Sequence, residues 1–197
     1  MNNRKKEGAS GESRLATVVV ETPKGSRNKF KYDPGTRMFK LSKVLPEGMV
    51  FPYDFGFVTS TKGEDGDPID VLVLLEEATF PGCLLECRIV GVIEAEQEDN
   101  LERKRNDRVI AVAQQSLLFS DITHIRDLRP ATLKQITAFF VNYQKLRNVE
   151  FTVLACHGPS KALDLLARGG LKTNQSRKGG GRSNSRERTR RESGVIS

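Results

Sequence analysis

Hydrophobic and polar positions alternate over short runs through the first half of the chain, which is the pattern of β-strands. Six such runs are rich in β-branched or aromatic residues and are bounded by turn residues such as Asp33-Pro34-Gly35. They are Leu15–Val20, Lys29–Tyr32, Met38–Leu41, Val71–Leu74, Leu84–Glu94 and Val109–Ala113. Short strands separated by Gly and Pro favour a sheet that closes on itself, so we expect a closed or nearly closed barrel.

The pattern changes to a helical period in the second half. Pro130 suits the first turn of a helix, and apolar side chains then recur at steps of three and four residues. These side chains are Leu133, Ile136, Phe140 and Tyr143. A shorter helix is predicted to begin near Pro159 and to end at Gly169-Gly170, with Ala162, Leu165 and Leu166 facing inward. The sequence therefore predicts an α+β fold with a mainly β core and two C-terminal helices packed outside.

Length and composition narrow the class of protein. The 197 residues suffice for one domain with tails, and 37% hydrophobic and 29% charged residues suit a soluble globular protein. The longest apolar runs fall far short of a bilayer span, which excludes a membrane protein. No apolar stretch follows the basic residues near the amino terminus, so no secretory signal is visible and we expect a cytoplasmic protein.

The net charge of +7 is concentrated at the two ends of the chain. Residues 172–197 carry eight basic and two acidic side chains among Gly and Ser, with almost nothing apolar to bury. We expect a disordered segment at 1–14, a folded domain at 15–171 and a disordered basic Arg/Gly/Ser-rich tail at 172–197. The domain itself is nearly neutral, so the overall basic charge does not identify its partner.

Three cysteines form an odd number in a chain without a visible export signal, which favours free thiols over a disulfide framework. Three residues separate Cys83 from Cys87, and His124 and His157 do not complete a zinc-ligand pattern. A zinc site is therefore not expected.

The most unusual local feature is the segment from Glu64 to Asp70, which has four carboxylates in seven residues and leads directly into a buried strand. A solvated acidic loop is one explanation. However, carboxylates beside a buried strand repel one another unless a cation neutralises them. Hard divalent cations prefer oxygen ligands, so the segment favours Mg²⁺ or Mn²⁺ over Zn²⁺. It is not a calcium EF-hand loop, because Asp70 stands where that loop requires Gly.

Several cations precede this acidic segment and are candidates for binding phosphate beside a Mg²⁺ ion. They are Lys24, Arg27, Lys29, Lys31 and Lys43. Taken singly, each is more often a surface charge than a ligand, because Lys and Arg are rarely buried. The chain contains neither a Walker A motif nor a Gly-rich dinucleotide fingerprint, so nucleotide binding by those routes is not supported.

The segment Asp65-Gly66-Asp67-Pro68-Ile69-Asp70-Val71 resembles the signature of the soluble family I inorganic pyrophosphatases, D-x-D-P-hydrophobic-D-hydrophobic. Flanking motifs occur in the family's order and near its spacings. They are Val19–Pro23, Lys31–Asp33, Phe51–Phe57, Pro81-Gly82, Val90–Val92 and Phe139 through Tyr143. The resemblance extends from about Thr17 to Val153.

This resemblance implies an OB-like five-stranded β-barrel and the hydrolysis of pyrophosphate to two phosphates with several Mg²⁺ ions, with Mn²⁺ as a second candidate. It makes Asp65 and Asp70 metal ligands and Glu21 a ligand of an outer metal. Asp67 would orient or deprotonate the attacking water. The phosphate oxygens would be contacted by Lys31, Lys43 and Tyr143. Members of the family also lead us to expect a homo-oligomer, a hexamer in bacterial-type proteins.

The chain departs from the family pattern at several of these positions. Lys43 stands where Arg is usual, Phe51 and Phe55 where Tyr is usual, and Gln144 where Lys is usual. A later motif, usually Asp-x-Lys, is here Asn106-Asp107-Arg108. Asn106 would thus take a metal-ligating position, Gln97 another, and Arg108 would bind substrate. Each change of Asp to an amide keeps an oxygen but removes a negative charge, which weakens metal binding.

Two interpretations of function remain open at this point. The first is a metal-dependent inorganic pyrophosphatase, supported by Glu21, Lys31 and the three aspartates of the signature. The second is a catalytically weak pyrophosphatase-like protein that binds RNA or another polyanion through its basic tail, because Arg with Gly and Ser favours sequence-independent phosphate contacts. The near-neutral domain argues against the second interpretation.

Overall fold

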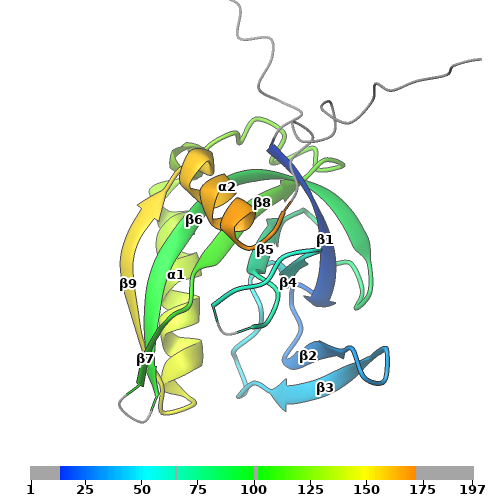
Figure 1. Ribbon diagram of the computed structural model, residues 1–197, viewed down its shortest axis with the longest axis vertical. Coiled ribbons are helices and arrows are strands. Elements are labelled where there is room, and N and C mark those ends of the chain that lie inside the picture. The colour runs from blue at the N-terminus through cyan, green and yellow to red at the C-terminus, as the bar shows by residue number, and fades with distance from the viewer. Residues whose placement is uncertain (1–13, 65, 100–101, 172–197) are drawn as a thin grey trace, which may run out of the picture.

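The computed structural model describes residues 14–64, 66–99 and 102–171 (Figure 1). The expectations for Asp65, for the tail 172–197 and for most of the segment 1–14 lie outside these residues. Nine strands are described: β1 (Leu15–Thr22), β2 (Asn28–Asp33), β3 (Met38–Val44), β4 (Asp54–Val58), β5 (Asp70–Leu74), β6 (Leu84–Asp99), β7 (Glu102–Arg105), β8 (Arg108–Ala113) and β9 (Glu150–His157). The helices are η2 (Ile125–Asp127), α1 (Pro130–Lys145) and α2 (Pro159–Arg168).

Five strands form a closed ring in the order β1, β4, β5, β8 and β6, and β6 returns to pair with β1. The β5–β8 pair is parallel and the other pairs in the ring are antiparallel. The predicted five-stranded OB-like barrel is thereby confirmed. The long strand β6 continues beyond the ring, where it pairs with β7 and β9, and β2 and β3 form a separate hairpin.

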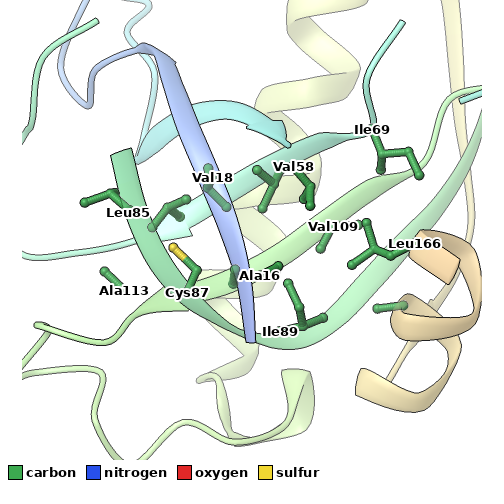
Figure 2. Close-up of a cluster of buried hydrophobic side chains, with 14 of the residues drawn as sticks. Ala16, Val18, Val58, Ile69, Leu85, Cys87, Ile89, Val109, Ala113 and Leu166 are labelled. Atoms are coloured by element: carbon green, nitrogen blue, oxygen red, sulfur yellow. The ribbon is translucent and has the colours of Figure 1, made fainter. Parts of the chain in front are cut away.

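The ring strands β5 and β8 are buried on both faces, which explains their uninterrupted apolar sequences. Val71 and Val73 belong to a cluster that draws residues from all five ring strands and so lies inside the barrel, whereas Leu72 and Leu74 belong to a second cluster outside it. Helix α2 closes the inner cluster with Leu166, which Figure 2 shows near Val109. Helix α1 packs on the outer cluster.

Both predicted helices are present and begin at the expected residues, Pro130 and Pro159. Gly169 ends α2 as predicted. Neither helix has the length and apolar character needed to cross a membrane. The three cysteines are free thiols, and Cys87 lies in the barrel core.

Three strands were not expected from the sequence: β4, β7 and β9. The sequence of β4 contains Gly56, which weakens a strand signal, yet the ring requires glycine there because the neighbouring backbone of β1 approaches closely. The charged sequence of β7 is stabilised by ladder pairing with β6 and by cross-strand ion pairs such as Arg103 with Glu98 at 3.0 Å. These contacts come from tertiary pairing and not from apolar alternation.

Candidate active site

A cavity of about 250 Å³ lies between the β2–β3 hairpin, the barrel and the end of α1. It collects nine of the ten residues to which the sequence assigned a role in the site: Glu21, Lys31, Lys43, Asp67, Asp70, Gln97, Asn106, Arg108 and Tyr143. The tenth, Asp65, lies outside the described residues. Residues from both halves of the chain therefore meet in one pocket, which we call the anion pocket.

Strand pairing positions the charged groups of the anion pocket. Asp70 is the first residue of β5 and Arg108 the first of β8, and these strands run parallel with Val71 opposite Val109. Both side chains consequently emerge at the same end of the barrel. The Arg108 guanidinium Nη1 lies 2.8 Å from Asp70 Oδ2 and forms an ion pair.

Glu21, near the end of β1, contributes a buried carboxylate to the pocket. Its Oε1 accepts a hydrogen bond from the backbone N–H of Tyr32 at 2.7 Å. Burial raises the pKa of Glu21, and the negative charge of Asp70 acts in the same direction. The Tyr32 hydrogen bond and the positive charges of Lys29 and Lys31 oppose this rise. A bound cation would favour the ionised form of Glu21.

Asp67 lies beside Lys31 of β2. Lys31 Nζ donates a hydrogen bond to Asp67 Oδ2 at 2.7 Å. This hydrogen bond is the main cause of the raised pKa of Lys31, so the amine stays protonated and the pair stays ionic. Both side chains are more than half exposed, at 53% and 57%, so Asp67 is open to water and to small ligands.

Lys29, Lys43 and Arg147 are three further cations that line the pocket. Lys29 and Lys43 are directly opposite each other in the β2–β3 hairpin, a destabilising arrangement for like charges. Burial and the positive charges of Arg147 and Lys29 lower the pKa of Lys43. Lys29 Nζ also lies 5.2 Å from the centre of the Phe55 ring and 5.3 Å from that of Tyr143. An anion bound here would relieve the repulsion among these cations.

Two buried side-chain atoms among the described residues have no hydrogen-bond partner, the Tyr143 hydroxyl oxygen and Arg108 Nε. Both residues line the anion pocket. Burying a polar group without a partner is unfavourable, and such groups are often completed by a ligand. The oxygens of a phosphate group are suitable acceptors for both donors.

The donor atoms of the pocket differ between its two sides. Glu21, Asp67 and Asp70 offer carboxylate oxygens, which suit a hard divalent cation. On the side of Asn106 the donors are neutral amides bonded to protein groups, and this side does not fit such a cation. Within the described residues no three Asp, Glu, His or Cys side chains are arranged as a complete metal centre.

Two pocket residues were not found from the sequence, Ser42 and Arg147. Arg147 lies two residues beyond the end of α1, so helical spacing from Tyr143 gave no signal for it. Ser42 lies beside Lys43 in β3 and gave no signal of its own. Lys29 was among the candidate cations, and the structure places it in the pocket together with Lys31 and Lys43.

The fold and the pocket together define a barrel enzyme that binds a substrate carrying phosphate groups. The family model for inorganic pyrophosphatase matches residues 18–171. The chain belongs to the inorganic pyrophosphatase family, whose members are hydrolases.

Individual proteins agree with this assignment. The inorganic pyrophosphatase of Methanosarcina acetivorans is 34% identical over 155 residues, covering 79% of this chain and 90% of the relative. That of Leifsonia xyli is 37% identical over 154 residues, covering 78% and 92%. The crystal structure of the Thermus thermophilus inorganic pyrophosphatase superposes with a TM-score of 0.74 at 32% identity, covering 83% of this chain and 92% of that one.

Proposed function

We propose that this chain hydrolyses inorganic pyrophosphate to two phosphates in the anion pocket, with Mg²⁺ as the natural cation and Mn²⁺ as a substitute. The observation that carries the proposal is the meeting of three carboxylates, three lysines and a buried, unpartnered tyrosine hydroxyl in one cavity. Carboxylates hold divalent cations, and lysine and tyrosine donors bind the phosphate oxygens. Family membership supports the same reaction.

Each group has a distinct role in this reaction. Lys29, Lys43 and the Tyr143 hydroxyl bind the oxygens of the substrate and neutralise the charge that develops on the departing phosphate. Asp67 accepts the proton of the attacking water, and Lys31 holds its carboxylate in position. Asp70 and Glu21, with Asp65, would hold the divalent cation. A bound divalent cation lowers the pKa of a coordinated water and neutralises the substrate.

The first experiment measures phosphate release from pyrophosphate by the purified full-length chain. We expect no release in chelator, and release that rises with Mg²⁺ and, in a separate titration, with Mn²⁺. Lack of release with either cation would contradict the proposal and leave the polyanion-binding interpretation of the tail as the better one. That tail, residues 172–197, lies outside the described residues.

A second prediction concerns the Tyr143 hydroxyl. The Tyr143→Phe variant removes one donor to the substrate, so kcat/KM should fall about 10- to 100-fold. Because that hydroxyl has no partner in the folded chain, the melting temperature should not decrease. Tyr53→Phe is the matched control, since Tyr53 is half-buried outside the anion pocket, and it should retain activity. Equal activity in the two variants would show that Tyr143 does not contact substrate.

For assembly and location, we propose a cytoplasmic homo-oligomer. Large apolar side chains that remain exposed, including Phe80, Leu84, Leu117 and Leu118, favour association between copies.

A further inference from the structure

A continuous set of hydrogen bonds connects the polar residues Gln97, Asn106, Arg108 and Gln144, which depart from the family pattern, with Arg147. Asn106 Nδ2 donates to Gln97 Oε1, and Gln144 Nε2 donates to the same oxygen at 3.4 Å. Arg108 Nη1 donates to Asn106 Oδ1, and Arg147 Nη1 donates to Gln144 Oε1 at 2.7 Å. We call these five residues the amide-arginine network. Each of its three amide oxygens already accepts a hydrogen bond from another member.

The amide-arginine network carries positive charge, whereas a site for a divalent cation carries negative charge. The network contains two guanidinium groups and no carboxylate, and Arg108 pairs with the carboxylate of Asp70. A hard divalent cation prefers anionic oxygen ligands, and neutral amides attract it much less. An arginine remains protonated at every accessible pH, so the positive charge cannot be removed to make room for a metal.

Packing fixes Arg108 in this arrangement. The residue is only 5% exposed, and its guanidinium carbon lies 5.4 Å from the ring centre of Phe140 and 5.9 Å from those of Phe55 and Phe151. Phe55, which takes the place of a tyrosine, therefore forms part of an aromatic wall around the cation. Gln144, another member of the network, is 2% exposed, and its lack of charge permits such deep burial.

Resting on the proposed function, we infer that the amide-arginine network replaces a divalent-cation site with a permanent cation. Arg108 supplies the positive charge beside Asp70, and Arg147 supplies a second charge at the mouth of the pocket. The phosphate group on this side is bound directly by guanidinium groups. The chain consequently binds fewer divalent cations than a pocket with aspartates at positions 97 and 106 would bind.

The test counts cations on the metal-free, full-length chain without substrate. Equilibrium dialysis against Mn²⁺, with metal measured by atomic emission, gives the number bound per chain. The double variant Gln97→Asp/Asn106→Asp introduces two carboxylates that, with Asp70, outnumber the Arg108 guanidinium. We expect it to bind one more Mn²⁺ per chain than the wild type. An equal number in the two proteins would overturn the inference.

A control variant tests whether a new carboxylate must lie in the network to bind an additional Mn²⁺ ion. Asn142→Asp places the same new carboxylate on the exposed surface of α1 and should add no bound Mn²⁺. If circular dichroism shows that the double variant is unfolded, the single variants Asn106→Asp and Gln97→Asp provide the same comparison. Because the count requires no turnover, an inactive wild type would contradict the proposed function while leaving this measurement decisive.

Discussion

The Asp67→Asn variant is expected to lose pyrophosphate hydrolysis by a factor of about 10² to 10⁴, the usual contribution of a positioned general base. Asparagine has nearly the same shape and its Oδ1 still accepts a hydrogen bond from Lys31, but its amide cannot take the proton of the attacking water. The loss should therefore appear mainly in kcat, measured by phosphate release at saturating Mg²⁺.

Stability should distinguish this catalytic loss from unfolding. The Asp67–Lys31 ion pair is largely exposed, and such pairs contribute about 1 kcal/mol or less. The melting temperature of Asp67→Asn should thus shift by only a few degrees. Asp164→Asn is the matched control, because Asp164 is exposed on α2 outside the anion pocket and its variant should remain fully active. Near wild-type turnover in Asp67→Asn would refute the role of Asp67 as base.

The Gly56→Ala variant is expected to fold poorly, with a loss of stability of about 4 kcal/mol or more. Gly56 lies between Val20 of β1 and Val71 of β5. A Cβ atom there would be 2.0 Å from the carbonyl oxygen of Val19 and 2.9 Å from the Cα of Val20. Both contacts are with backbone atoms of the closed ring, so a side-chain rotation cannot relieve them.

The measurement is soluble yield followed by guanidinium unfolding monitored by circular dichroism. Gly35→Ala is the control, because a Cβ there meets a single side-chain atom, Asp33 Oδ1 at 3.2 Å, and no backbone atom. Its stability should change little. If Gly56→Ala unfolds at the same denaturant concentration as the wild type, the β1–β4 pair separates more easily than the closed ring implies.

The sequence predicted those elements that local patterns specify and missed those that tertiary contacts stabilise. Helix α1 was predictable because its apolar face repeats at the helical period, which is a local property. Strand β7 was not, because its stabilising partners are carboxylates on β6 that only the hairpin brings opposite. The signature from Asp67 to Asp70 identified the family and, by resemblance, Glu21 and Tyr143 as partners in the site. Arg147 was missed because its contact with Gln144 requires the chain to turn at the end of α1.

By itself, the sequence determined the fold class, both helices, the family and nine residues that meet in the anion pocket, because burial patterns and a contiguous motif are local properties of the chain. Only the tertiary structure decided which contacts are made by the residues that differ from the family pattern. The parallel β5–β8 pairing places Arg108 against Asp70, and α1 brings Gln144 to Gln97 across forty-seven positions of the chain. Such contacts depend on strand register and helix packing, which no local pattern of residues specifies.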